Sequence, residues 1–600
     1  MARLPDLPNG SRVQQVTQIS FGGLHAGENC RDGEWKNMIN MSVADLPVIR
    51  TRPRRQRAPW TAKNATTGYA TDEGKLIYID AAGAVWQQML VGGERMLLSK
   101  PGTVKHAAAA RIVRFGNRAM IMPDGLLLQI GYKIKGRTPS IADLPPTEQA
   151  GDAWIVATDA IYMFDGKRWI YKGQLAEPVQ RVVEQYSLRI GNGSLHGEPA
   201  EANQITLDGS FNVDRRFRVG DAVEISGLTA IPANNKTLII REIDNTSIRF
   251  NENAFELPEG QTGYTETAGD EPFTITRKWP ELDFCFEHGN RMWGGKGKTI
   301  YCSKLGDPLN WYVLGDGLST DGWQLETQSD GELTGGISYS GYPTFFKPQK
   351  RIMIYGSNPS NFSTREIDMP GAAPGNGMTK IAGGRMIYRA EDTMMIYTSE
   401  GYPQAQRDEL GRVFAEESDI AASTGREYIG LIDANWHLGI YSWNADRGAW
   451  AMEDQWDDDD DHDVRCMMQT GTRVLLMRID GTVELIRGDA INGWLDEGDF
   501  DSLLETGDMT GNAANHKWVT RVLVRLKVEA GAKVEIDVSC DGGEWIRTGI
   551  IDNGGGRKTE SWYFPVRPNR CDHYRIRFRG HGEWQLRSMA IERRIGSAMH

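Results

Sequence analysis

A run of six aspartates and one histidine is the densest group of possible metal ligands in the sequence. Its members are Asp457, Asp458, Asp459, Asp460, Asp461, His462 and Asp463. Clustered carboxylate oxygens are the ligands that Ca²⁺ prefers. The run lacks the Asp-x-Asp-x-Asp-Gly alternation of an EF-hand loop, and consecutive carboxylates cannot all point toward one ion. We therefore predict a solvated, self-repelling loop that would repel DNA if it lined a channel.

A second candidate is the segment SCDGGEWIRTG at residues 539–549, which is similar to the Asp-box turn of sialidase propellers. Trp545 comes one place early for that motif, and the segment lies outside the repeats described below. A β-turn with a packed Trp545 is the better interpretation.

Motifs of other catalytic classes are missing from the sequence: Gly-x-Ser-x-Gly, a Walker loop and His-Glu-x-x-His do not occur. A propeller glycosidase would need paired carboxylates or a tyrosine nucleophile in one pocket, and the sequence neither identifies nor excludes such a pair. Trp154 and Trp169 could stack on a sugar or anchor a small core. The sequence favours a protein that is not an enzyme and that has no catalytic, cofactor-binding or metal-binding residues.

Composition indicates many short strands rather than long helices. The 600 residues include 68 Gly, 18 Trp and 19 Tyr, and one core rarely serves so long a chain. The net charge of −12 argues against a protein that holds nucleic acid by its overall field. The six cysteines form no CxxC pair and resemble reduced, buried residues, although a Cys540–Cys571 disulfide stays open. Neither a secretory signal nor an apolar run of membrane-spanning length is present, so we expect a soluble protein.

A glycine-basic-apolar opening recurs along the chain and defines a repeat. It stands at Gly116, Gly289, Gly384 and Gly471, with looser versions at Gly74 and Gly430. Gly74 and Gly116 are 42 residues apart, and Gly430 and Gly471 are 41 apart. A period of roughly 40–50 residues with several short strands is typical of a β-propeller. We predict an all-β fold whose main part is a propeller of six or seven blades; an irregular all-β chain is the alternative.

Interruptions of the repeat set the expected domain boundaries. We predict a docking arm at residues 1–60, first blades at 61–137, inserted small β modules at 138–276 and remaining blades at 277–490. A linker at 491–516 then precedes a C-terminal β-sandwich at 517–600, where long alternating strands appear.

The leader at residues 1–60 carries basic side chains between three prolines, which rule out a long helix. Two interpretations of Arg52, Arg54 and Arg55 stay open. They could pair with an acidic body of the same chain, or they could dock, together with Trp35, onto another subunit or onto DNA phosphates.

Several segments resemble virion proteins of tailed bacteriophages. In the leader, the matching positions are Trp35, Asn40, Met41, Ser42, Pro47, Val48, Ile49, Arg52 and Pro53. A second match is the S-x-x-G-D-P-x-x-W segment at residues 303–311. Residues 144–173 are also similar to a small module of phage tail and fibre proteins. Propellers of this kind resemble the nozzle or tail-hub proteins of short-tailed phages, although the insertions and the terminal sandwich exceed what a minimal nozzle requires.

This resemblance implies a structural subunit that forms a ring, with six copies expected, at the tail channel through which DNA is retained and ejected. Implied partners are the tail tube, adaptor or portal-proximal proteins, tail fibres or spikes, and DNA that passes without specific binding. Asp457–Asp461 would then be a lumen or gate loop. The implied location is the virion tail, assembled in the bacterial cytoplasm. The alternative is a tail protein that binds or degrades glycans of the host surface; a bacterial propeller unrelated to phage leaves the leader motif unexplained.

Overall fold

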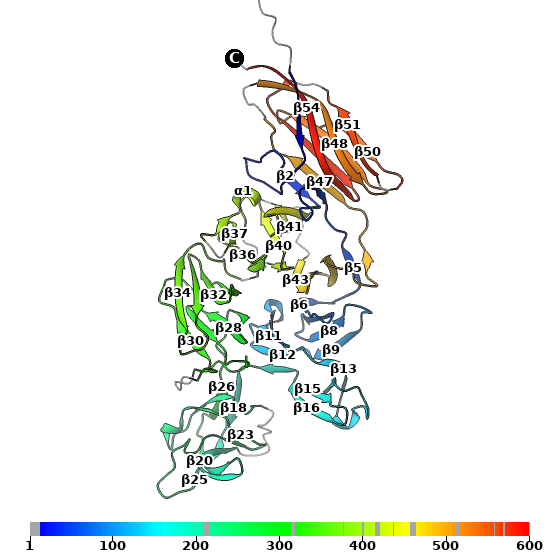
Figure 1. The fold of residues 1–600 in the computed structure, drawn as a ribbon. Helices are drawn as coiled ribbons and strands as arrows, with labels where there is room; N and C mark the ends of the chain where they lie inside the picture. Colours follow the sequence, from blue (N-terminus) through cyan, green and yellow to red (C-terminus); the bar gives the residue numbers. More distant parts are fainter. Residues whose placement is uncertain are drawn as a thin grey trace, which may run out of the picture.

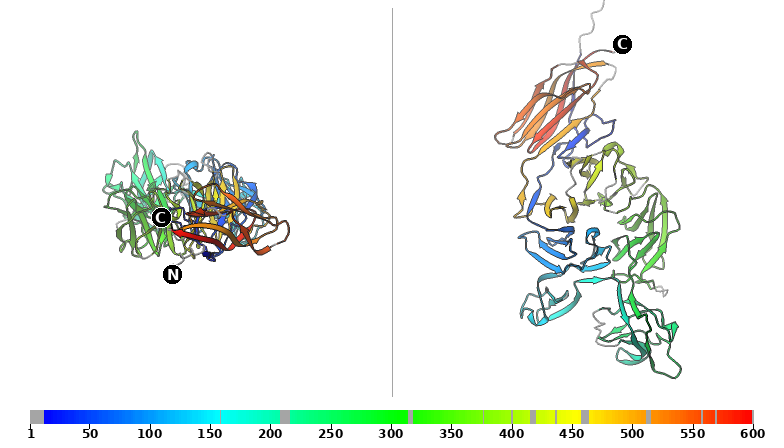
Figure 2. Two further views of the ribbon diagram at one scale, coloured as in Figure 1. Left: turned by 90° about the horizontal axis from the view of Figure 1, so that it is seen from above. Right: turned by 180° about the vertical axis from the view of Figure 1, so that it is seen from behind.

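The computed structural model describes residues 12–157, 159–207, 216–313, 318–375, 377–398, 401–414, 420–435, 437–456, 464–510, 515–556, 558–567 and 570–598. Within these residues the fold is all-β, with a single short α-helix, α1 (Arg407–Leu410), and a few 3₁₀ turns. The molecule is elongated: a sandwich of sheets forms one end, a propeller the middle, and two inserted modules the other end (Figures 1 and 2). The predicted fold class is confirmed.

The propeller consists of seven antiparallel sheets, which we number as blades 1 to 7. Blade 1 contains β6 (Ala65–Ala70), β7 (Lys75–Asp80), β8 (Val85–Met89) and β9 (Arg95–Ser99). Blade 2 contains β10 (Arg111–Phe115), β11 (Arg118–Met122), β12 (Leu126–Gln129) and β17 (Ala176–Pro178). Blade 3 contains β27 (Phe284–His288), β28 (Arg291–Lys296), β29 (Thr299–Cys302) and β30 (Trp323–Glu326). Blade 4 contains β31 (Gly335–Tyr339), β32 (Tyr342–Lys347), β33 (Lys350–Tyr355) and β34 (Ser363–Asp368).

The remaining blades complete the circle. Blade 5 contains β35 (Lys380–Ala382), β36 (Arg385–Arg389), β37 (Met394–Tyr397) and β38 (Gln404–Ala405). Blade 6 contains β39 (Ile420–Ser423), β40 (Glu427–Ala434), β41 (His437–Asn444) and β42 (Ala449–Gln455). Blade 7 contains β43 (Val464–Thr470), β44 (Arg473–Arg478), β45 (Thr482–Arg487), β5 (Gln56–Thr61) and β46 (Leu495–Asp496).

The blades form a closed ring. Strand β43 of blade 7 contacts β6 of blade 1, and β10 of blade 2 contacts both β6 and β27. Apolar side chains fill the space between neighbouring blades; for example, Phe346 of blade 4 stacks on Tyr388 of blade 5 with ring centroids 5.2 Å apart. The ring closes because β5, from the N-terminal segment, pairs antiparallel with β45.

The recurring glycine of the repeat has a conformational cause. Gly116 and Gly289 each follow the first strand of a blade and have φ values of +57° and +58°. Glycine adopts this left-handed region without the steric cost of a Cβ atom, so it fits the tight turn between the first two strands. The basic residue two places later, Arg118 or Arg291, begins the second strand.

Two modules are inserted around β17 of blade 2. The first is a four-stranded sheet of β13 (Lys133–Thr138), β14 (Asp152–Val156), β15 (Ala160–Phe164) and β16 (Trp169–Gln174). The second has two sheets around one apolar core. Its strands are β18 (Arg181–Gln185), β19 (Ser187–Leu195), β20 (Glu198–Leu207), β21 (Ala222–Ser226), β22 (Thr237–Ile239), β23 (Glu242–Ile243), β24 (Ser247–Arg249), β25 (Gly263–Thr267) and β26 (Phe273–Arg277).

The terminal sandwich is built from both ends of the chain. One sheet contains β1 (Arg12–Gln18), β3 (Met41–Ser42), β4 (Ile49–Thr51), β48 (Asn515–Val528), β51 (Lys558–Pro565), β52 (Arg570–Cys571) and β54 (Trp584–Ala598). The other contains β2 (Trp35–Ile39), β47 (Asp501–Thr506), β49 (Lys533–Cys540), β50 (Ile546–Asp552) and β53 (Tyr574–His581). Side chains of both sheets share one buried cluster.

Three expected boundaries therefore differ from the structure. Residues 12–61 are strands of the sandwich and of blade 7 rather than an extended arm, because their apolar side chains, such as Met38 and Ile49, are fully buried. The expected linker at 491–516 contains β46, which belongs to blade 7, and β47, so the C-terminal part of the sandwich begins at Asp501. Strand β17 lies inside the range expected for the insertions but completes blade 2 by pairing with β12.

Candidate functional site

Trp35 lies in the core of the sandwich. It has no exposed surface, and its ring lies 5.6 Å from that of Phe21 and 6.2 Å from that of Phe578, centroid to centroid. Main-chain pairing of Trp35 with Thr506 joins its strand β2 to β47. A side chain buried in this way offers no surface to another subunit, so the prediction of Trp35 as a docking residue is wrong.

Arg52 pairs with an acidic residue far away in the sequence. Its Nη1 and Nη2 atoms each donate a hydrogen bond of 2.7 Å to the Glu497 carboxylate, and its Nε donates to Asn40 Oδ1 at 2.8 Å. The guanidinium also lies over the Phe500 ring at 4.1 Å. Burial raises the pKa of Glu497, but the hydrogen bonds and charge of Arg52 outweigh that effect and bring this pKa below its ordinary value.

The next two arginines of the leader also pair with distant acidic residues. The three arginines and their partners form a seam between the sandwich and the propeller. Arg54 donates to Asp499 at 2.6 Å and also to Glu583, and both contacts raise the pKa of its guanidinium, that with Glu583 more strongly. Arg55 is 5% exposed and donates at 2.5 Å to Asp454 of blade 6.

Of the two interpretations of the leader arginines, the structure supports pairing with acidic groups of the same chain. The docking role predicted for Arg52, Arg54 and Arg55 is not supported, because their guanidinium groups are used within the chain. They instead join the sandwich to the propeller. The predicted acidic loop, Asp457–Asp461, lies outside the described residues.

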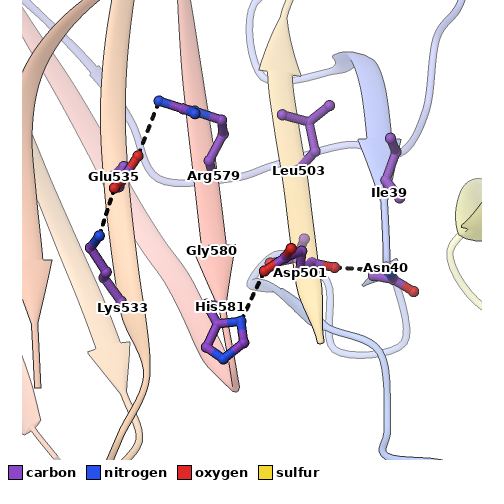
Figure 3. Close-up of a pocket in the computed structure, with 10 residues that line it drawn as sticks. Ile39, Asn40, Asp501, Leu503, Lys533, Glu535, Arg579, Gly580 and His581 are labelled. Atoms are coloured by element: carbon purple, nitrogen blue, oxygen red, sulfur yellow. Dashed lines mark hydrogen bonds and ion pairs between the residues drawn. The ribbon is translucent and has the colours of Figure 1, made fainter. Parts of the chain in front are cut away.

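A groove of about 490 Å³ crosses the outer face of the smaller sandwich sheet (Figure 3). Charged side chains line it in two groups. Glu535 contacts Lys533 at 2.7 Å and Arg579 at 3.0 Å, and Asp501 contacts His581 at 2.9 Å. The hydrogen bond from Lys533 holds the pKa of Glu535 below its ordinary value. Glu535 is therefore ionised near neutral pH, which suits an ion pair better than a proton donor.

The Asp-box-like segment forms the predicted turn. Ser539 Oγ donates to the Gly543 carbonyl at 2.7 Å, and Trp545 lies half-buried under the guanidinium of Arg577 at 4.3 Å. This arrangement is a packed turn on the sandwich surface.

The G-D-P-x-x-W segment holds the second inserted module against blade 3. Asp307 accepts hydrogen bonds from the Asn310 side chain at 2.5 Å and from the Leu309 amide at 3.2 Å. Asn310 in turn accepts a hydrogen bond from the Ala222 amide of the module, at 3.1 Å. Trp311 donates to Pro308 O at 2.8 Å, which fixes the turn.

A buried ion cluster completes this anchor. Arg277, 1% exposed, contacts Asp221 at 2.6 Å and Glu177 at 3.1 Å. Arg218 contacts Asp307 at 3.4 Å. Burial raises the pKa of Asp307, but the charge of Arg218 and the hydrogen bond from Asn310 bring it below its ordinary value. Sequence reasoning missed this cluster, since its members are isolated charges in separate strands and loops.

The described ranges contain no group of three His, Cys, Asp or Glu side chains arranged to hold a metal ion. In the same ranges, no helix is long and apolar enough to cross a membrane.

Comparisons with known proteins reach only remote likenesses. No family model and no curated protein matches the chain. Among solved structures, Hsv2 of Kluyveromyces lactis is 11% identical with a TM-score of 0.24; the match covers 34% of this chain and 60% of Hsv2. The WD40 β-propeller domain of Doa1 is 6% identical with a TM-score of 0.28, over 74% of this chain and 99% of that one. An exo-β-1,3-galactanase of Phanerochaete chrysosporium is 10% identical with a TM-score of 0.19, over 51% of this chain and 94% of that one. With TM-scores this low, none of these likenesses supports an argument about function.

Proposed function

We propose that this protein is a non-enzymatic structural subunit of a tailed-phage virion. Six copies form a ring at the tail channel, as a nozzle or tail hub through which DNA is retained and ejected. The ring also serves as a platform for the tail tube or adaptor and for fibres or spikes. Assembly takes place in the bacterial cytoplasm.

The observation that supports this proposal most directly is the use made of the two motifs that resemble phage virion proteins. Trp35 and Arg52 of the leader hold the sandwich together and join it to the propeller. Asp307 and Asn310 of the second motif contact Arg218 and the Ala222 amide of an inserted module and hold it against blade 3. Residues that fix large parts of a chain relative to one another suit a rigid wall subunit.

Electrostatics are consistent with DNA that passes without being held. The chain carries a net charge of −12. Binding to DNA gains free energy when basic side chains replace counterions on phosphates, and a wall of like charge removes that gain. We therefore expect no measurable affinity of the assembled ring for double-stranded DNA at physiological salt.

Native mass spectrometry of the purified full chain over a range of concentrations, with electron microscopy of the same sample, tests the proposal. A closed ring with a central hole, and the presence of the protein in purified virions, are the expected results. A protein that is monomeric at high concentration and missing from virions would refute the proposal. A trimer without a hole would do the same, and would favour a receptor-binding tail component.

A further inference from the structure

The outer face of the first inserted sheet carries a row of aromatic side chains. Trp154 on β14 pairs in register with Tyr162 on β15, and Tyr162 pairs with Tyr171 on β16. Side chains in register on adjacent strands point to the same face of a sheet. The residues that alternate with them, Ala153 and Ile161, are fully buried against blades 1 and 2. The three aromatic rings therefore face away from the propeller.

At one end of the row the aromatic ring lies on the sheet, whereas at the other end it is exposed to solvent. Gly136 on β13 pairs with Trp154, and a Cβ atom at Gly136 would come within 2.8 Å of the indole ring, so the ring lies on this glycine. The rings of Tyr162 and Tyr171 have centroids 5.6 Å apart at an interplanar angle of 53°. Tyr171 is 44% exposed, and Trp154 and Tyr162 are partly exposed.

Neighbouring aromatic residues on the same face are already covered. Trp169 donates a hydrogen bond of 2.9 Å to the Pro145 carbonyl, and its ring packs on Phe164, which is 6% exposed. These two side chains form a small core beneath the segment before β14. The sequence left two roles open for both tryptophans, stacking on a sugar or anchoring a small core. Trp169 anchors a small core, whereas Trp154 belongs to the row of aromatic side chains.

Exposed cations stand at one end of the row. Lys133 and Lys135 have side chains that are 57% and 44% exposed, and both approach Asp152, whose side chain is only 3% exposed. Residues 131–175 contain six basic and five acidic side chains, in contrast to the acidic chain as a whole.

We propose that this row, Trp154, Tyr162 and Tyr171, binds an acidic polysaccharide. The apolar faces of sugar rings would stack on the aromatic rings, while carboxylates of the glycan would pair with Lys133 and Lys135. Neighbouring strands are about 4.8 Å apart, close to the length of one sugar unit, so three strands would hold about two units. A proline-rich peptide would need a groove between aromatic walls, whereas this face is an open sheet.

The first inserted sheet, with β15 and β16, lies on the side of the propeller away from the sandwich, which contains β1 and β54; the second inserted module extends farther (Figure 1). The inference goes beyond the structural role proposed above and does not depend on ring formation.

Biolayer interferometry with the full chain tests the inference. The immobilised probes are alginate and polygalacturonate oligosaccharides, a neutral cello-oligosaccharide and a proline-rich peptide. We expect binding to an acidic glycan that weakens with salt. Tyr162→Ala and Tyr171→Ala should each weaken it about tenfold, and Lys133→Gln with Lys135→Gln should reduce its salt dependence.

The matched control is Tyr186→Ala, since Tyr186 is 59% exposed on the second inserted module and should not change binding. Circular dichroism checks that each variant is folded. The inference is overturned by absence of binding to both acidic glycans, by equal binding to the neutral glycan, or by full affinity in a folded Tyr171→Ala variant. Binding of the proline-rich peptide, with no binding of the glycans, would assign the row to a peptide ligand instead.

Discussion

The six cysteine thiols differ sharply in the environment of their sulfur atoms. Burial raises the pKa of Cys30 to about 11 and the pKa of Cys285, Cys302 and Cys466 to about 12. Cys540 is the exception, because a hydrogen bond from Cys571 lowers its pKa, while the same contact raises that of Cys571. Both are free thiols; Cys540 lies on β49 of one sandwich sheet and Cys571 on β52 of the other.

We predict that iodoacetamide at pH 8 alkylates the native protein first at Cys540. The thiolate is the reactive form, so a lowered pKa and partial exposure increase its rate, whereas raised pKa values protect the other thiols. Peptide mass spectrometry over a time course measures the order of labelling.

Cys540→Ser is the control and should remove the fast phase. It should leave slow labelling at the other positions. Labelling of Cys30 at the same rate as Cys540 would contradict the assignment, because both side chains are partly exposed and differ in the direction of their pKa shifts.

At the scale of elements, buried ion pairs join parts of the chain that have their own cores. Arg277, Asp221 and Glu177 lie where the second inserted module meets blade 2. Removing one partner of a buried pair leaves an uncompensated charge.

Arg277→Met should destabilise the attachment of this module by about 3–5 kcal/mol, because Asp221 and Glu177 would lose their counter-charge. Hydrogen exchange across residues 177–277 and limited proteolysis measure the effect. Arg241→Ala, a change at an exposed arginine of the same module, should alter stability by less than about 0.5 kcal/mol. Equal protection in both variants would show that the ion cluster does not hold the module.

The seam between sandwich and propeller should weaken in acid. The pKa of Glu497 is lower in the folded protein than its ordinary value, so its ion pair with Arg52 stabilises the fold above that ordinary value, about 4.3. This contribution is lost as pH falls through the lower folded pKa. Calorimetry between pH 6 and 3 should show an acid-induced decrease that is smaller in Glu497→Gln. An identical pH profile in that variant would exclude Glu497 as a source of the decrease.

At the scale of the whole molecule, the N-terminal segment supplies strands to both the sandwich and the propeller. Strands β1 to β4 belong to the sandwich, and β5 completes blade 7. Closing a propeller with a strand from the other end of the chain joins the last blade to the first and leaves only short, protected strand edges.

A chain of residues 62–600 should therefore fail to fold, since it lacks strands from two cores. The control is a circular permutant in which residues 12–61 follow residue 598 through a short glycine linker. Strand β1 pairs with β54, with Arg12 opposite Ile595, so the linker has little distance to span. We expect calorimetry to show cooperative unfolding for the permutant but not for the truncated chain. Cooperative unfolding of the truncated chain would refute the role of the N-terminal strands.

Local pattern explains why much of the architecture could be predicted. Tight turns need glycine at positive φ, and half-buried strands need alternating side chains, so Gly116, Gly289 and the alternation around Val522 are visible within a few residues. The propeller, the two insertions and the terminal strands follow from such signals. The aromatic side chains of the first insertion were also visible, but their register across three strands was not.

Contacts between distant residues were decided only by the tertiary structure. Arg52 and Glu497 are 445 positions apart, and β5 meets β45 only when the ring closes. The cost of closing a loop depends weakly on its length, so sequence distance does not show which partner an arginine will find. Trp35 illustrates the same point: its residue type suited either a core or an interface, and burial against Phe578 decided between them. The sequence by itself determined the strands and their turns, whereas the packing of both chain ends into one sandwich determined what the leader does.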